Sequence, residues 1–242
     1  MGEWDWAIDT IVDLEPLMTE TAERIWFSSF GNVIRAYRGE DVEAEARAIY
    51  EESLAFDDPQ YRGVGASSLV VSSLVNGRFD EVRRLSEEFI DQPGGVEAVP
   101  YLVRAAIWNG DLATAREARP RFTEFGAGRR QDALLATMDG GIAALDGRTD
   151  EARARFSDAR RLHAEMGTLL WLGVTDLDIV ITGAMEPDER RQAAEEAREI
   201  FTRLRAKALL DKLNAALTES ASRTRTETPA TARTEEGIGQ EA

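Results

Sequence analysis

Few side chains in this sequence are suited to chemistry. The chain has no cysteine, which excludes disulfides, thiolate nucleophiles and thiolate metal ligands. His163 is the only histidine, and it stands in a charged stretch, Asp-Ala-Arg-Arg-Leu-His-Ala-Glu, that is typical of a helix surface. A metal site needs partner ligands at suitable spacing, and none accompanies this histidine. We therefore expect His163 to be a solvated helical residue rather than a metal ligand.

Two further stretches have a loose likeness to ligand-binding loops. Gly63 and Gly65 have the spacing of a phosphate loop, but no strand pattern precedes them and no lysine follows. Asp146 and Asp150 lie in an acidic stretch that lacks the ligand pattern of a calcium loop. We interpret the first stretch as glycines in a loop or at the start of a helix, and the second as a turn. The sequence thus predicts no catalytic residue, no metal site and no cofactor, and an enzyme is the least favoured function.

Charge and hydropathy narrow the environment of the chain. The 242 residues carry a net charge of -16, which disfavours direct binding to nucleic acid and to anionic membranes. The N-terminus lacks the basic and apolar regions of a signal peptide. The most apolar stretch, residues 169–185, contains Asp176 and Asp178, so we interpret it as a buried helix rather than a membrane span. A cytoplasmic protein is expected.

A repeat in the sequence indicates which structural elements would position a functional site. A glycine followed five residues later by a small or apolar residue recurs at intervals of 33 to 38 residues. Glycine tolerates the positive φ that ends the first helix of a hairpin, and a small residue then lets the second helix approach closely. Such a period predicts stacked helical hairpins. The copies begin at Gly2, Gly39, Gly77, Gly110 and Gly147, with a degenerate copy at Gly183, and the small residues are Ala7, Ala44, Val82, Ala115 and Ala152.

Hydrophobic periodicity gives the helices of these hairpins. It predicts helices at residues 3–18, 20–38, 41–56, 61–76, 79–91, 96–109, 111–124, 130–146, 148–166, 168–182, 187–205 and 206–217. The expected fold is all-α: a right-handed α-solenoid of antiparallel helical hairpins with about 11 to 12 helices in one domain, residues 1–217. By the repeat register, the helix at 3–18 lacks its hairpin partner, so we expect the chain to be the tail of something longer. Residues 218–242, rich in Thr, Ser, Glu and Arg, are expected to be disordered.

The glycine, aromatic and alanine positions of the repeat resemble the tetratricopeptide repeat, with Leu69 and Leu102 on its leucine position. The closing segment, residues 197–213, resembles the end of the helical-repeat region of bacterial multidomain signalling ATPases that carry a class III adenylate cyclase or a LuxR-type DNA-binding domain. That family has glycine where Arg205 stands and proline where Ala208 stands. We expect this loss to let the last helix run on without a sharp turn.

The tetratricopeptide resemblance implies that the first helices of the hairpins line a concave groove. Counting back from the turn glycines Gly39, Gly77, Gly110 and Gly147 gives the candidate groove residues, and Trp, Tyr and Arg among them are typical of binding hot spots. Packing between hairpins is the competing interpretation for each one. The predicted function is a non-enzymatic scaffold for a protein or peptide, including upstream domains of its own parent; the alternative is a module that senses a small ligand. The groove residues are Trp26, Ser29, Val33, Tyr37, Ser67, Val71, Arg104, Trp108 and Thr137.

Overall fold

The computed structural model describes residues 4–92, 95–124 and 128–227, and this part of the chain is all-helical. It contains twelve α-helices and three short 3-10 helices, with no strand among the described residues. The α-helices are α1 (Trp4–Leu14), α2 (Thr21–Tyr37), α3 (Glu43–Ser53), α4 (Pro59–Val75), α5 (Phe79–Phe89), α6 (Val99–Asn109), α7 (Leu112–Ala118), α8 (Arg129–Leu145), α9 (Thr149–Met166), α10 (Leu169–Thr182), α11 (Pro187–Leu204) and α12 (Lys207–Glu227). The 3-10 helices are η1 (Glu15–Leu17), η2 (Gly95–Ala98) and η3 (Arg119–Glu124).

The predicted helices agree with these elements except at the C-terminal end. The last helix was expected to stop at residue 217, but α12 continues to Glu227. The expected disorder is therefore wrong for residues 218–227, and residues 228–242 lie outside the described part of the chain. Hydrogen bonds from the hydroxyls of Thr218 and Ser222 to carbonyl oxygens four residues earlier accompany this helical extension.

The turn glycines adopt the backbone conformation that the repeat predicts. Gly39, Gly77, Gly110 and Gly147 have φ values of 83°, 73°, 73° and 74°, the left-handed region that other residues rarely enter. Gly183, the degenerate copy, has a φ of 67°. Gly2 lies outside the described residues. These four glycines therefore end the first helix of a pair at each turn.

The prediction that the small residue after each turn glycine is buried against the preceding helix can be checked in four copies. Burial is found in three of them and not in the fourth. Val82, Ala115 and Ala152 are fully buried in the first turns of α5, α7 and α9. Ala44, by contrast, is exposed. The turn after Gly39 is longer, because α3 begins at residue 43, so Ala46 takes the buried position instead. Ala46 packs in a cluster with Ala66 and Leu69 of α4, so the buried alanine of this copy does not make the predicted contact with α2.

The expectation that the last helix runs on past Arg205 is wrong. Arg205 has a φ of 56°, and it is the only residue other than glycine with a positive φ among the described residues. The backbone N–H of Ala206 donates to the carbonyl of Phe201, which closes the end of α11. A left-handed arginine therefore makes the turn that glycine makes at the other helix ends.

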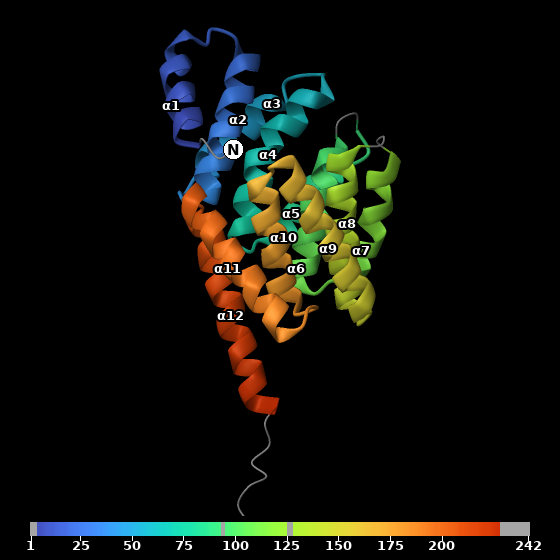
Figure 1. Cartoon of the computed structure of the whole chain (residues 1–242). Helices are drawn as coiled ribbons and strands as arrows, with labels where there is room; N and C mark the ends of the chain where they lie inside the picture. Colours follow the sequence, from blue (N-terminus) through green and yellow to red (C-terminus); the bar gives the residue numbers. More distant parts are fainter. Residues whose placement is uncertain (1–3, 93–94, 125–127, 228–242) are drawn as a thin grey trace, which may run out of the picture.

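Helices that follow one another in sequence pack together, and the two ends of the chain also meet. α2 contacts α3 and α4, α8 contacts α9, and α10 contacts both α9 and α11. Beyond these neighbours, α10 packs against α6, and α12 packs against α2 and α4 (Figure 1). Asp5 of α1 forms ion pairs with Arg38 and Arg205, which joins the N-terminal helix to the start of α12. The C-terminal helix α12 consequently covers one side of the core.

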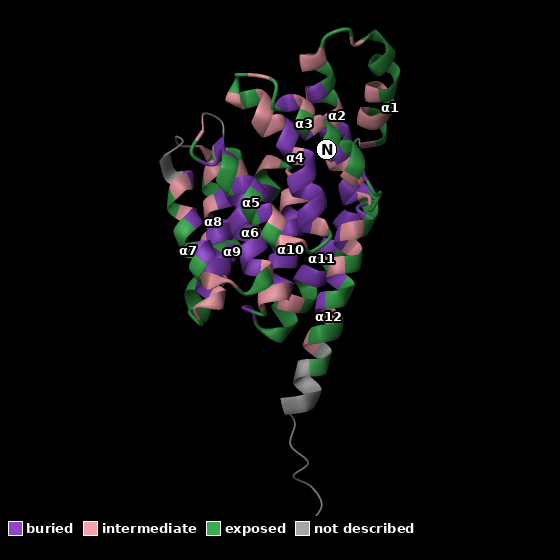
Figure 2. Cartoon of the chain, turned by 180° about the vertical axis from the view of Figure 1, so that it is seen from behind, coloured by how far each residue is buried: buried purple, intermediate pink, exposed green. Residues whose placement is uncertain are grey.

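The burial pattern separates inner from outer helices. α4, α6 and α10 carry buried residues on most of their surface, whereas α1 has none (Figure 2). α10 is buried on every side, including Asp176 and Asp178, which confirms the prediction of a buried helix at this position. Within the described residues, no helix has both the length and the apolar character needed to cross a membrane.

Candidate functional site

The predicted concave face is largely filled, so most of the candidate groove residues are inaccessible. The expectation of an open groove there is wrong, because α10 and α12 pack across the inner helices α2, α4 and α6. Their apolar residues join one cluster; Leu177 and Leu213 lie in it with Tyr37 and Val71 of the predicted groove. The buried groove candidates are Ser29, Tyr37, Val71, Arg104 and Thr137, whereas Trp26, Val33, Ser67 and Trp108 are half-buried.

Arg104 and Trp108 belong to a buried polar network instead of a binding face. Both donate to Asp178 of α10: the Arg104 Nε lies 3.1 Å from Oδ2, and the Trp108 Nε1 lies 2.6 Å from Oδ1. The guanidinium of Arg104 also lies 5.3 Å from the centre of the Trp171 ring. Burial raises the pKa of Asp178, while Arg104 and the indole N–H oppose this rise. A buried ion pair of this kind fixes how α6 packs on α10, and it explains both residues as structural.

A second buried carboxylate lies on the other side of α10. Asp176 Oδ1 is 2.8 Å from Arg160 Nε of α9, without hydrogen-bond geometry, and Arg160 Nη2 bonds Glu196 of α11 at 2.5 Å. Arg160 is thus the positively charged neighbour of two carboxylates, those of Asp176 and Glu196. Burial raises the pKa of Asp176 from 3.8 to about 8, with a smaller opposing effect of Arg160 and further increases from Glu196 and Asp178. At neutral pH this carboxyl is therefore mainly protonated.

The expectation that His163 is solvated is wrong, since only 1% of its surface is exposed. Its Nδ1 lies 2.9 Å from the hydroxyl of Thr168, which itself donates to the backbone carbonyl of His163. The pKa of His163 is lowered to about 4, first by burial and then by the positive charge of Arg104. The imidazole is neutral at pH 7, and it helps to close the turn between α9 and α10.

A cavity with an apolar lining and convergent polar groups lies in the N-terminal half of the described chain. Trp26 of α2 and Ser67 of α4, both groove candidates, line a cavity of about 430 Å³. We call it the aromatic cavity, because Phe30, Phe89 and Tyr101 also line it. The remaining lining residues are Pro59, Gln60, Gly63, Val64, Ala66, Val70, Leu85, Gly95, Glu97, Ala98 and Arg130.

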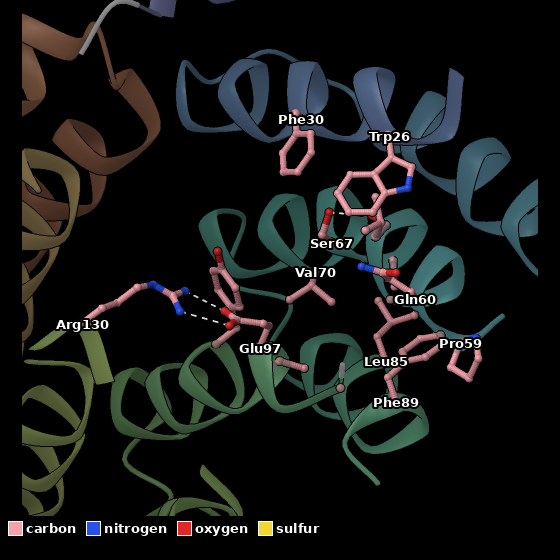
Figure 3. A pocket seen from close by; sticks show the side chains of 16 residues that line it. Trp26, Phe30, Pro59, Gln60, Ser67, Val70, Leu85, Phe89, Glu97 and Arg130 are labelled. Carbon is pink, nitrogen blue, oxygen red and sulfur yellow. Dashed lines mark hydrogen bonds and ion pairs between the residues drawn. The ribbon is translucent and has the colours of Figure 1, made fainter. Parts of the chain in front are cut away.

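The walls of the aromatic cavity come from five α-helices, α2, α4, α5, α6 and α8, and from the 3-10 helix η2. Trp26 and Phe30 descend from α2 over α4, and their ring centres lie 5.7 Å apart with a 45° tilt (Figure 3). The α4 wall is made by Gln60, Ser67 and Val70 (Figure 3). Phe30 is 50% exposed, so this aromatic wall is open to solvent on one side. The hydroxyl of Ser67 donates to the carbonyl of Val64 in its own helix, 2.7 Å away.

A bidentate ion pair closes the far side of the cavity. Arg130 of α8 donates to both carboxylate oxygens of Glu97 in η2, at 3.0 and 2.6 Å (Figure 3). Gly95 sets the position of η2, because a Cβ there would lie 1.7 Å from the carbonyl oxygen of Phe89. Both charged side chains are about half-exposed, at 46% for Arg130 and 58% for Glu97. The pair is thus accessible to a competing charge.

The lining of the aromatic cavity suits binding rather than bond making. It contains no histidine and a single carboxylate, Glu97, which is already paired with Arg130. Burial raises the pKa of Tyr101, so its phenol stays protonated at neutral pH. Across the described residues, no cluster of three or more His, Cys, Asp or Glu side chains is arranged to hold a metal ion. The remaining capacity is for an apolar group that has a polar end.

Sequence reasoning found two residues of this cavity and missed the rest. Trp26 and Ser67 followed from the repeat register, because both lie on first helices. Phe89 lies on α5, a second helix that the register does not assign to a groove, and Glu97 lies in η2, within the first helix predicted at residues 96–109 but not among its groove candidates. Arg130 is the second residue of α8, and it pairs with Glu97, which lies 33 residues earlier in the sequence. Its separation from Glu97 is close to one repeat length, which is the only sequence signal for this pair.

Comparisons with protein-family models, with curated proteins and with solved structures find no match to this chain.

Proposed function

We propose that this chain is a non-enzymatic, tetratricopeptide-like binding protein that takes up an apolar side chain of a protein or peptide partner in the aromatic cavity. The observation that carries this proposal is the pair Trp26 and Phe30, which overhang a cavity of about 430 Å³ while Phe30 stays half-exposed. Large aromatic side chains beside a pocket are typical of binding hot spots. Burying Phe30 fully against a partner is favourable because apolar surface leaves water.

The repeat supports the array part of this proposal. Four turn glycines with positive φ recur at intervals of 33 to 38 residues, each between two helices that pack together. A right-handed solenoid of such hairpins, wound tightly enough for its ends to meet, accounts for the contacts of α12 with α2 and α4. In this arrangement the partner binds between hairpins at the N-terminal half, and the inner face serves as core.

The resemblance of the closing segment supports a setting in the cytoplasm, as the regulatory or interaction part of a bacterial signalling or transcription-regulatory system. The partner class then includes upstream domains of a parent protein. The net charge of -16 favours a basic partner surface and opposes direct contact with nucleic acid or anionic membrane.

A peptide selection on the full chain tests the proposal. Phage-displayed random peptides are selected against the full chain, and the dissociation constants of enriched peptides are measured by fluorescence anisotropy. Ser67→Phe places a ring into the aromatic cavity from its α4 wall and should weaken binding by at least about tenfold, or about 1.4 kcal/mol.

The matched control is Trp6→Ala, which removes a 66% exposed aromatic side chain of α1 outside the cavity. It should leave the dissociation constants unchanged. Circular dichroism verifies that both variants fold. The proposal is wrong if no peptide is enriched, or if the enriched peptides bind Ser67→Phe as tightly as the parent chain.

A small apolar ligand is the second candidate, and the volume of the cavity favours it. About 430 Å³ lies within the range of small-molecule sites, which are mainly apolar with a few polar groups. A ligand that stabilises the parent chain in a thermal-shift screen, but not Ser67→Phe, would support this function. A screen without any such ligand would leave the protein partner as the occupant.

A further inference from the structure

The charges at the aromatic cavity indicate which kind of partner side chain enters it. We propose that the occupant is a cationic side chain of the partner, a lysine, whose ammonium replaces Arg130 as the counter-ion of Glu97. This inference rests on the proposed function, and it specifies the chemistry of the partner at that same cavity.

The aromatic wall favours a cation over a neutral group. The faces of aromatic rings carry negative partial charge and attract ammonium groups within about 6 Å of the ring centre. Trp26 and Phe30 are tilted by 45° rather than stacked flat, and Tyr101 and Glu97 line the same cavity. A lysine stem is apolar along its length, so it can pack along these rings while its ammonium stays at the open side.

The chain already holds one of its own lysines in this manner. The Nζ of Lys212 in α12 lies 4.8 Å from the centre of the Trp108 ring and 5.4 Å from that of Phe79. Lys212 is half-buried, and the charge of Glu219 also acts on it. Two aromatic rings thus accommodate an ammonium at the surface of this fold, and the aromatic cavity offers comparable rings together with a carboxylate.

The ion pair at the cavity can be exchanged at little cost. Glu97 and Arg130 are the only charged residues of the lining, and both are about half-exposed. Exposed ion pairs of this type contribute only about 0 to 1 kcal/mol, so a second cation can displace Arg130 into water. An anionic ligand could in principle replace Glu97 instead. The acidic field of a chain with net charge -16 repels such an anion and attracts a cation.

Matched peptides test this inference. Acetylated and amidated Leu-Xaa-Leu peptides, with lysine, norleucine or glutamate as Xaa, are titrated into the full chain and followed by the NMR signal of the Trp26 indole N–H. The lysine peptide should bind about tenfold tighter than the norleucine peptide, which keeps the stem and lacks the charge. The glutamate peptide should bind most weakly.

Two variants of exposed side chains then locate the charge effect. Glu97→Gln should reduce the preference for lysine over norleucine while the aromatic rings keep part of it, whereas Arg130→Gln, which removes the competing cation, should retain or increase it. The inference is overturned if the glutamate peptide binds most tightly, if norleucine equals lysine on the parent chain, or if Arg130→Gln abolishes the preference. Should all three peptides fail while the phage-selected peptides still require the cavity, the lysine inference falls and the proposed function stands.

Discussion

Asp176 gives this fold a pH dependence whose size follows from its surroundings. The carboxyl is fully buried on α10, facing Arg160 of α9 and Glu196 of α11, with Asp178 on its own helix. Its pKa rises from 3.8 to about 8, because burial outweighs the attraction of Arg160. The native state therefore binds one proton more than the unfolded state at pH values between these two limits.

The sign of the effect is set by that extra proton. A pKa raised by folding contributes stability that is complete below about pH 4 and is lost as the pH rises towards about 8. Each pH unit in this window costs about 1.4 kcal/mol, so the loss between about pH 5 and pH 8 is about 4 kcal/mol. An asparagine has nearly the same shape and cannot ionise. We expect the free energies of unfolding of Asp176→Asn and the parent chain to diverge by about 4 kcal/mol over this interval, the variant being the more stable at high pH.

Urea denaturation at several pH values, followed by circular dichroism, measures this difference. Subtracting one chain from the other cancels the contribution of the remaining carboxylates. Asp188→Asn is the matched control, because it makes the same substitution at a side chain that is 85% exposed. Parallel stability curves for Asp176→Asn and the parent chain would refute the reasoning, since they would mean that Asp176 is ionised in the native state throughout.

Three further predictions concern backbone strain and the buried ion pair. Gly110→Ala should destabilise the fold by about 1 kcal/mol or more, because Gly110 has a φ of 73°. Gly63→Ala should stabilise the fold by about 0.5 to 1 kcal/mol, because Gly63 lies in a helix with open space around it. Equal shifts of the urea midpoint in the two variants would contradict the turn assignment. Arg205→Gly should stabilise by about 0.5 to 1 kcal/mol in the same assay, because glycine relieves the left-handed strain, and a loss would mean that the surface ion pair of this arginine outweighs it. Asp178→Ala should cost about 3 to 5 kcal/mol because it leaves Arg104 buried without a counter-charge; thermal and urea unfolding should show most of this loss recovered when Arg104→Met is added, and an additive double variant would contradict the account.

The sequence predicted the local features of the fold because these depend on neighbouring residues. Gly77 and Gly147 could be assigned to turns because the backbone at each turn has a positive φ, which glycine adopts readily. The limits of the method appear at Ala44, where the same spacing failed because a longer turn moved the buried position to Ala46. His163 failed for a related reason: its sequence neighbours are charged, but its own position faces the core.

The candidate site was predictable only in part. The residues that line it depend on contacts between helices that are distant in the sequence. A repeat register specifies which residues of each hairpin face inward, and two of these candidates, Trp26 and Ser67, line the aromatic cavity. It does not specify whether the inward face stays open. Here Leu213 of α12 joins Val71 of α4 in one apolar cluster, a contact between residues far apart in sequence. Such a contact has no local signal that periodicity could detect.

The packing of α10 and α12 on the inner face also explains the positions of the polar residues there. An open groove would leave Arg104 free to meet a ligand, whereas a filled one must supply its counter-charge from within, and Asp178 does so from α10. The sequence contains this clue in the form of two aspartates within its most apolar stretch. A carboxylate in such a helix needs a buried cation, and Arg104 on an inner helix is the residue that satisfies it. Trp26 and Phe30 line the aromatic cavity, and Phe30 stays half-exposed there, which is why the proposed partner is placed at this cavity.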